Sequence, residues 1–572
     1  MTASDATRAQ VLDDAPPTAE SEPWQERLRR FGYKACSGAD VRERLVPSFP
    51  KSSVLLAKFT RSGTSGVWFV AWGWLGPVLV AALAGAIRFW HLGQPQAVIF
   101  DETYYAKDAW SLLHLGYEGS WPERKVADLH MLAHPQVISL SDTGSFVAHP
   151  PTGKWVIALG EWMFGLNPFG WRFMTATVGT LSVLMLSRIG RRMFRSTLLG
   201  CLAGVLMAVD GLHVVMSRSA LLDLLLMFFV LGAFGCLLID RDQARARLGA
   251  ALPEDADGHA RSDASVGDNT STGLRPWRIA AGLCLGLAAS TKWNGLYVLL
   301  FFVILAFFWD VAARRVAGAS HPYRAGLRKD FSWSALSLIP VAGMTYLATW
   351  TGWFLSDNGY GRHWADSRGG TWSWIPAQLR SLWHYEYGVY QFNVGLHTPH
   401  RYQSNPWSWL VLGRPVLFHY ESPKLGNEGC TVTARCVETV LALGTPMLWW
   451  SACCALVYLL FRWALRRDWR AGAILAAVAA GYLPWFLYQD RTIFQFYAVV
   501  FVPYLCLAVT MMLGAVMRPP NASERRRVLG AVVAGVLVLL IAWNFIYFFP
   551  IYTAQVIPYS SWQSRMWLTT WV

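Results

Sequence analysis

The sequence predicts an all-α polytopic membrane protein with about eleven transmembrane helices, and three observations support this fold class. First, 54% of the residues are hydrophobic and only 15% are charged, whereas soluble proteins carry about 25% charged residues. Second, apolar runs that can cross a hydrocarbon core of ~30 Å recur through the chain. Third, clusters of Lys and Arg separate alternate runs, as the positive-inside rule requires. The net charge of +14 therefore indicates topology, and we expect no nucleic-acid partner.

Residues 1–66 form a polar N-terminal arm. The arm contains Pro16-Pro17 and the basic run Glu26-Arg27-Leu28-Arg29-Arg30. Because the first apolar run begins too late in the chain for a signal peptide, we expect the arm to be cytoplasmic and partly disordered.

Residues 67–354 are predicted to form an N-terminal transmembrane catalytic region. Its first span ends in Arg88-Phe89-Trp90-His91 and leads into an extracytoplasmic loop, residues 92–168. Within this loop the apolar segment 155–164 is too short to cross, so it is predicted to be an interfacial helix. The spans of this region are expected near residues 67–90, 169–186, 198–215, 220–238, 279–289, 296–309 and 333–354.

Residues 355–436 form the largest extracytoplasmic loop. Its many Trp, Tyr and His residues suit a folded cap with helices at the membrane interface. Cys430 and Cys436 lie together in this polar loop, so they are expected to form a disulfide if the loop faces an oxidising compartment. Residues 437–572 complete the chain as a C-terminal four-helix transmembrane region with an external tail. The last four spans are expected near residues 437–461, 471–487, 494–516 and 528–549.

Unusual polar groups gather at the outer face of this topology. Two adjacent carboxylates, Asp101 and Glu102, follow the first span, where they can ionise, bind a cation or accept a proton. Any one outer cation can be an ordinary side chain that reaches for the interface. Positive charge outside runs against the topological bias, however, so several cations together indicate an anionic ligand, such as a phosphate carried on a lipid. The cationic or titratable groups concerned are His149, Lys154, Arg172, Lys292 and Arg491.

A carboxylate pair that faces a phosphate-sized cationic site suits glycosyl transfer from a lipid phosphate. Arg and Lys can stabilise the leaving anion, and an Asp or Glu can take the proton of the incoming hydroxyl. Direct displacement with one base inverts the anomeric carbon. Adjacent acids can instead bind a divalent metal. Only two acids are evident and no His lies at a ligand-like spacing, so we expect no required cofactor, with a metal as the lesser alternative.

Several motifs, in this order and at these positions of the topology, resemble the protein O-mannosyltransferases. That family has the multispanning fold of lipid-phosphosugar glycosyltransferases known as GT-C, and the resemblance runs from about Ala81 to the C-terminal tail. Tyr402-x-Ser404-x-Pro406-Trp407 and the cysteine pair resemble the bacterial, especially actinobacterial, branch. The large loop is also too short for the β-trefoil insertion of the eukaryotic members. The motifs are Phe100-Asp101-Glu102, His149-Pro150-Pro151-x-x-Lys154, Arg172-Phe173, Ser217-Arg218-x-x-Leu221-Leu222-Asp223, Ser290-x-Lys292-x-x-Gly295 and Arg491-x-x-Phe494-x-x-Tyr497.

The resemblance implies roles for individual residues. Asp101 would be the base that activates a Ser or Thr hydroxyl, with Glu102 supporting it or contacting the sugar. The donor phosphate would be bound by Arg172, Lys292, Arg88 and Arg491. His149 and Lys154 match a family motif without an assigned role, and Arg218 and Asp223 are expected to form a structural intramembrane ion pair.

The resemblance also implies partners. The donor would be a polyprenyl-phosphate mannose in the lipid of the cell membrane, and the acceptors would be Ser/Thr-containing translocated proteins. The secretion translocon is a further possible partner.

Two other functions compete with this prediction. A related transferase would pass a lipid-linked sugar to a glycolipid or a cell-wall glycan, and it would differ only in the acceptor groove. A peptide acceptor needs an open slot, which the loop 355–436 could supply. A transporter or flippase would place its polar residues near the bilayer midplane and often shows repeated halves. Here the polar residues gather at the outer edge and no repeat is evident, which favours an interfacial enzyme.

Overall fold

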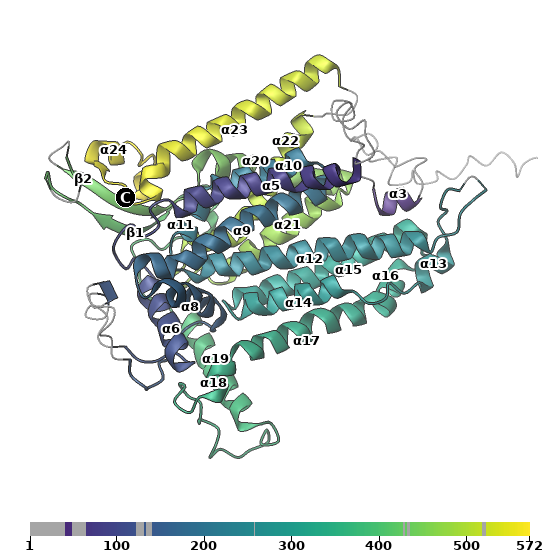
Figure 1. The fold of residues 1–572 in the computed structure, drawn as a ribbon. Coiled ribbons are helices and arrows are strands. Elements are labelled where there is room, and N and C mark those ends of the chain that lie inside the picture. The colour runs from purple at the N-terminus through teal and green to yellow at the C-terminus, as the bar shows by residue number, and fades with distance from the viewer. Residues whose placement is uncertain are drawn as a thin grey trace, which may run out of the picture.

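The computed structural model describes residues 41–47, 65–121, 128, 131–132, 140–256, 258–426, 429–431, 435–517 and 522–572. Long helices lie side by side through the middle of the molecule, and short elements gather at its two ends (Figure 1). Most of the predicted arm 1–66 lies outside the described residues. Its described part includes α3 (Val41–Leu45), where Leu45 packs on Leu248 of the bundle and accepts a hydrogen bond from Arg245.

Long apolar helices lie at most of the predicted crossings. Within the described residues, eight helices are long and apolar enough to span a membrane, or nine if a pair of helices bent by 67° is one span. Two shorter apolar helices, Gly73–Phe89 and Pro276–Ala289, lie at two further positions where the sequence predicts spans. The elements that make up these crossings are α5 (Ser65–Phe89), α9 (Pro168–Phe194), α10 (Thr197–Ala208), α11 (Gly211–Ser217), α12 (Leu222–Ala250), α14 (Pro276–Ala289), α15 (Asn294–Ala317), α17 (Ser332–Thr349), α20 (Pro446–Arg466), α21 (Trp469–Tyr482), η4 (Leu483–Leu487), η5 (Gln495–Phe501), α22 (Val502–Met517) and α23 (Glu524–Tyr552).

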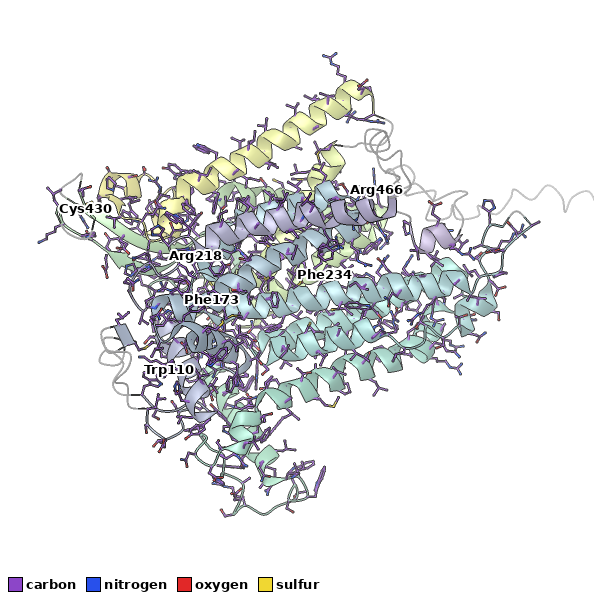
Figure 2. The ribbon with its side chains drawn as sticks, viewed as in Figure 1. Trp110, Phe173, Arg218, Phe234, Cys430 and Arg466 are labelled. Carbon is purple, nitrogen blue, oxygen red and sulfur yellow. A yellow bond between two sulfur atoms is a disulfide. The ribbon has the colours of Figure 1, made fainter. Side chains whose placement is uncertain are left out.

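The two ends of the bundle differ in composition. The capped end carries α6, α8, α18, α19, three β-strands and α24, whereas α3, α13 and α16 lie at the other end, here called the basic end (Figure 1). Figure 2 places Cys430 at the capped end and Arg466 at the basic end, with Phe234 between them. Arginines in the last turns of α9, α15 and α20 mark the basic end. The bounds are α6 (Glu102–Leu115), α8 (Thr152–Phe164), α13 (Ala264–Asn269), α16 (Pro322–Ala325), η2 (Gly326–Phe331), α18 (Thr351–Leu355), α19 (Ala377–Val394), η3 (Pro406–Ser408), α24 (Tyr559–Gln563) and η6 (Thr569–Trp571).

A small antiparallel sheet at the capped end departs from the all-α prediction. Strands β1 (Val416–Glu421), β2 (Cys436–Ala442) and β3 (Ile557–Pro558) lie in the order β1-β2-β3. The predicted span 437–461 is therefore wrong at its start. Its first residues are rich in β-branched side chains, which favour a strand, and α20 begins only at Pro446, because Pro suits the first turn of a helix. The predicted disulfide between Cys430 and Cys436 is present beside this sheet.

The helices pack through small residues, as membrane-embedded helices do. A Cβ added to Gly190 of α9 would lie 3.2 Å from the Cα of Gly200 of α10, so the two backbones almost touch there. The most enclosed spans are α12 and the η5–α22 segment, with 67% and 78% of their apolar windows buried, whereas α23 is 28% buried. Among the described spans these two are therefore the most central, whereas α23 lies at the periphery of the bundle.

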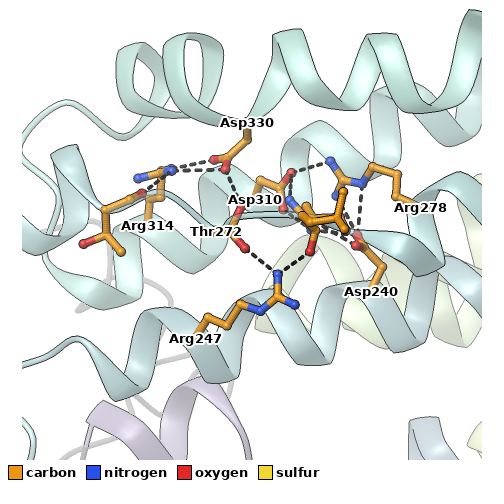
Figure 3. Close-up of polar contacts among 10 residues, drawn as sticks. Asp240, Arg247, Thr272, Arg278, Asp310, Arg314 and Asp330 are labelled. Carbon is orange, nitrogen blue, oxygen red and sulfur yellow. Dashed lines mark hydrogen bonds and ion pairs between the residues drawn. The ribbon is translucent and has the colours of Figure 1, made fainter.

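Three helices are joined by buried ion pairs toward the basic end (Figure 3). Asp240 of α12 and Asp310 of α15 both accept hydrogen bonds from Arg275 and Arg278, which stand at the start of α14, at 2.7–3.0 Å. These four side chains are 2–6% exposed. Because each carboxylate contacts two guanidinium groups, the quartet fixes α12, α14 and α15 relative to one another.

We predict that Asp240→Asn lowers the stability of the protein by about 3–5 kcal/mol, because it leaves two buried guanidinium groups with half of their counter-charge. The measurement is thermal unfolding of the full chain in detergent. Glu254→Gln is the control, because Glu254 pairs with Arg42 at an exposed site (41% and 54% exposed) where an ion pair contributes ~1 kcal/mol or less. Equal midpoints for the two variants would contradict the structural role of the quartet.

Candidate active site

The Phe100-Asp101-Glu102 segment forms the start of α6 at the capped end. Asp101 is the N-cap residue and Glu102 the first helical residue. Phe100 has a φ of 46°, a left-handed conformation that costs a non-glycine residue roughly 1–2 kcal/mol. Its ring is stacked on Phe418 of β1 at 4.7 Å and meets the edge of Phe496 at 5.5 Å. This aromatic cluster holds the strained turn at Phe100, which directly precedes the two carboxylates.

Glu102 is fully buried and forms a bidentate ion pair with Arg172 of α9. The Arg172 Nε donates to Glu102 Oε1 and its Nη2 donates to Oε2, both at 2.8 Å. The backbone N–H groups of Ile99 and Ala220 donate to the same carboxylate at 3.1 and 3.0 Å. The carboxylate of Glu102 is therefore used for structure, and it holds together α6, α9 and the segment before α12.

The Arg172 guanidinium is used in the same way. Beyond Glu102, it donates to the backbone carbonyls of Pro95 and Ala97 at 2.9 and 2.8 Å. Both side chains of the ion pair are 0% exposed. The resemblance predicts that Arg172 binds the donor phosphate; in the structure its guanidinium contacts Glu102 and the backbone.

Asp101 lies outside this ion pair and is half-buried. Its backbone carbonyl accepts hydrogen bonds from the N–H groups of Tyr104 and Tyr105, in the first turn of α6. Burial raises the pKa of the Tyr105 phenol well above its usual range, and the nearby carboxylates of Asp101 and Asp223 raise it further. The ring of Tyr105 lies 6.1 Å from that of His149. Tyr105 therefore links Asp101 to the His149 side of the site.

The predicted pair of Arg218 and Asp223 is not formed. Arg218 donates to the carbonyls of Arg88, Trp90 and His91 at 2.6–3.0 Å, and so binds the C-terminal end of α5, where a cation is favoured. Asp223 instead accepts a hydrogen bond from Lys292 at 2.7 Å. Arg218 and Asp223 therefore each have a buried partner, but they are not partners of one another.

Lys292 and Arg88 differ in their relation to the site. Lys292 stands in the break between α14 and α15, and its Nζ lies 5.0 Å from the ring centre of Tyr497. Arg88 is fully buried in the last turn of α5 and contacts His213 Nδ1 at 2.7 Å and Ser217 Oγ at 3.3 Å. Lys292 remains at the edge of the site, whereas Arg88 belongs to the packing between α5 and α11.

Lys154 belongs to a buried charged cluster between α6 and α8. Its Nζ donates to Glu118 and to the His149 carbonyl, the latter at 2.8 Å, and lies 3.8 Å from Asp108. Burial raises the pKa of Asp108 to about 7, and Glu118 adds to this shift against the opposing effect of Lys154. Lys154 therefore fastens the loop that carries His149 and does not itself face the cavity described next.

His149 and Arg491 line one cavity of about 300 Å³. Asn393 accepts a hydrogen bond from the Arg491 Nη2 at 2.9 Å, while the buried Arg491 Nε has no hydrogen-bond partner among the described residues. Burial lowers the pKa of His149 well below its usual range, and the positive charges of Lys292, Lys154 and Arg491 lower it further. The cavity thus offers a cation with an unused donor and a neutral imidazole, a setting that suits an anion.

An apolar cavity of about 660 Å³ adjoins the first one. It lies among residues of α15, α17 and α19, and both cavities are lined by Trp293, Leu296 and Tyr390. Its lining includes Ile339, Leu347 and other apolar side chains. A polar pocket that continues into an apolar groove matches a ligand with a charged head and a hydrocarbon tail.

Sequence reasoning identified His149 and Arg491 but missed several groups around them. Asn294 and Asn393 line the same cavity, and Tyr105 connects it to Asp101. Phe100 was noticed only as a motif neighbour, although its ring anchors the turn. The signal for Asn294 was its place two residues after Lys292, in the break between two short apolar runs.

Comparison with known families follows the two halves of the chain. Residues 78–250 match the family described as dolichyl-phosphate-mannose-protein mannosyltransferase. Residues 378–571 match the family described as the C-terminal four-transmembrane region of protein-O-mannosyltransferase. The matched segments contain α6, α9 and Arg491, whereas the cavity residues of α15 and α17 lie between them.

Individual proteins show the same similarity. The polyprenol-phosphate-mannose–protein mannosyltransferase of Mycolicibacterium smegmatis is 39% identical over 517 residues, which are 88% of this chain and 93% of that protein. The protein of the same name from Corynebacterium glutamicum is 31% identical over 506 residues, or 86% and 92% of the two chains. A chain of the Saccharomyces cerevisiae protein O-mannosyltransferase Pmt1-Pmt2 complex bound to the sugar donor has a TM-score of 0.64 at 14% identity, and covers 87% of this chain and 92% of that one. This structural similarity confirms the predicted GT-C fold.

The two adjacent acids should respond differently to neutralisation. Glu102→Gln is expected to cost about 3–5 kcal/mol of stability, because the buried Arg172 loses its counter-charge. Asp101→Asn should cost within about 1 kcal/mol, since the side chain is half-exposed, makes no cap hydrogen bond to the helix and keeps its size in the variant. Thermal unfolding of both variants in detergent measures the difference. A destabilised Asp101→Asn beside an unaffected Glu102→Gln would reverse this assignment.

Proposed function

The chain belongs to the dolichyl-phosphate-mannose-protein mannosyltransferase family, and from this membership we propose that it transfers mannose from a polyprenyl phosphate to Ser or Thr hydroxyls of proteins. The single observation that carries the proposal is the similarity to actinobacterial protein mannosyltransferases over nearly their whole length. The paired cavities at the capped end support it independently, because they suit a lipid with a phosphate head.

The donor binds across the two cavities. Its polyprenyl chain occupies the apolar groove among α15, α17 and α19, and its phosphate lies in the smaller cavity near Arg491. The unpartnered Nε of Arg491 donates to a phosphate oxygen, while Lys292 is paired with Asp223 and acts only at longer range. Because His149 is neutral there, its imidazole can hydrogen-bond to the donor without a charge of its own.

Asp101 is the base. As the acceptor Oγ attacks the anomeric carbon, its proton passes to the Asp101 carboxylate, and the bond from that carbon to the phosphate oxygen breaks. The phosphate leaves with the bonding electron pair, and Arg491 stabilises the charge that develops on it. One displacement of this kind inverts the anomeric carbon.

Glu102 and Arg172 are positioning residues, which orient Asp101 without touching the substrates. Their ion pair fixes the first turn of α6, and so holds the Asp101 side chain at the edge of the bundle. Arg88 is likewise a packing residue, because its guanidinium is enclosed between α5 and α11. Of the four residues that the motifs suggested as phosphate ligands, we therefore assign direct contact to Arg491 alone, with Lys292 acting at longer range.

The capped end faces the extracytoplasmic side of the cell membrane. The arginines at the basic end favour a cytoplasmic position of that end by the positive-inside rule, and the disulfide at the capped end suits an oxidising compartment. In this orientation the N-terminal arm is cytoplasmic. Acceptor proteins reach the site as translocated chains, which the secretion translocon delivers to that side.

Asp101→Asn should lower transfer by ~10²-fold or more, because it removes the base and keeps the size of the side chain. The assay follows mannose from a labelled polyprenyl-phosphate donor to a Ser/Thr peptide in membranes that contain the full chain. Asp142→Asn, an exposed acid of the same loop, is the control and should retain activity. Near-normal transfer by Asp101→Asn would discard the assignment of the base.

Arg491→Gln should lower kcat/KM for the donor about 10- to 100-fold, the effect of removing one charge-assisted hydrogen bond of about 1.5–3 kcal/mol. The KM for the acceptor peptide should stay unchanged, because only the phosphate contact is lost. Arg401→Gln is the matched control, since Arg401 is an exposed arginine at the same end. A donor dependence equal to that of the wild-type protein would exclude Arg491 from the phosphate site.

A further inference from the structure

A second group of ligating side chains lies on the β1–β2 ribbon, outside both cavities. His419 and Glu421 are two residues apart on β1, so they project from the same face of the strand. Glu438 of β2 is the cross-strand partner of Glu421. The ligating atoms of the three side chains lie within 4.8 Å of one another. The antiparallel register therefore brings one imidazole and two carboxylates close together on the ribbon.

The imidazole at this point is buried and lacks a partner. The side chain of His419 is 9% exposed, and its Nε2 has no hydrogen-bond partner among the described residues. The Nε2 lies 4.0 Å from Glu421 Oε1 and 3.9 Å from Glu438 Oε1, which is too far for hydrogen bonds. A buried polar atom in this situation requires an explanation, because leaving it unsatisfied costs about 1–3 kcal/mol.

A divalent ion would give the Nε2 of His419 a partner, with Glu421 and Glu438 as further ligands. Zinc bonds of about 2.0–2.2 Å to nitrogen and oxygen place tetrahedral ligands ~3.4 Å apart. The ligating atoms lie within 4.8 Å of one another, so side-chain shifts of up to ~0.7 Å each would close the site. The half-exposed Glu421 leaves a path by which an ion and a completing water can enter.

We propose that His419, Glu421 and Glu438 bind one divalent transition-metal ion of the zinc class. An imidazole with two carboxylates suits zinc, whereas magnesium and calcium prefer sites made of oxygen alone. The proposal does not depend on the transfer reaction, since none of the three residues lines the donor cavities.

The position of the ion gives it a structural role. It would join β1 to β2 one residue after Phe418, whose ring is stacked on Phe100 beside Asp101. A metal there would stiffen the strand that supports the strained turn before α6. It would therefore hold the wall of the site without touching the reacting atoms.

The test measures zinc bound to the full, tag-free chain in detergent. The protein is stripped with EDTA, equilibrated with ZnCl₂, freed of excess ion and analysed by elemental mass spectrometry. About one zinc per chain is expected for the wild-type protein. His419→Gln and Glu421→Gln should bind it at least ~10-fold more weakly, because each loses a direct ligand.

His363→Gln is the matched control. His363 also lies beside two carboxylates, at 2.6 Å from Asp366 and 3.9 Å from Asp357, but it is 53% exposed and outside the proposed site. This variant should keep its zinc. Glu421→Gln guards against a folding defect, because its side chain is 52% exposed and its replacement leaves the strand intact.

Thermal unfolding provides an independent readout. ZnCl₂ should raise the unfolding midpoint of the wild-type protein and of His363→Gln, since the ion binds the folded ribbon alone, and it should not raise that of Glu421→Gln. Without metal, wild-type protein and Glu421→Gln should unfold at the same temperature. Absence of bound zinc in the wild-type protein, or zinc retained in full by both His419→Gln and Glu421→Gln, would overturn the proposal.

Discussion

The buried ion pair between Glu102 and Arg172 is the interaction on which the rest of the capped end depends. Taking both charges out of water costs several kcal/mol each, and their attraction offsets this only with near-ideal geometry and further hydrogen bonds. The structure meets both conditions, with two parallel contacts of 2.8 Å, two backbone N–H donors and two carbonyl acceptors. Such a pair adds little net stability, but it allows one arrangement of α6 and α9. This arrangement also sets the orientation of Asp101, which directly precedes Glu102 in the chain.

The same principle recurs at other places along the bundle. Lys292 is paired with Asp223, Lys154 with Glu118, and the quartet around Asp240 joins three helices toward the basic end (Figure 3). Each pair joins elements that are distant in the sequence. Apolar helices in a bilayer have no strong hydrophobic preference for one packing register over another. Buried ion pairs and close glycine contacts therefore select the register. The buried charges named here are thus parts of the scaffold, because each is already paired with an opposite charge.

This use of charge explains what could be predicted from the sequence and what could not. The crossings followed from hydropathy and from the arginines at the loops, because both reflect the solvent that each residue meets. The disulfide followed from two cysteines in one polar loop. The partner of Arg172 could not be found in this way, because Glu102 is 70 residues away and only the packing of α6 on α9 brings them together. For Arg218, the acid closest in sequence was the wrong choice, since Asp223 pairs across the bundle with Lys292. The β-ribbon was missed because its apolar, β-branched residues continued into a helix and looked like one run.

The balance of charge around the polar cavity then singles out one residue. Lys154 and Lys292 are neutralised by Glu118 and Asp223, and Arg172 by Glu102. Arg491 contacts only the neutral amide of Asn393 and forms no ion pair within the described part of the chain. The Arg491 side chain is half-buried with a buried Nε, so the absence of a counter-charge has a cost that an anionic ligand removes when it binds. The adjoining apolar groove restricts such a ligand to an anion that carries a hydrocarbon chain. The scaffold thus neutralises its other nearby cations internally and leaves the last one to be paired by the donor.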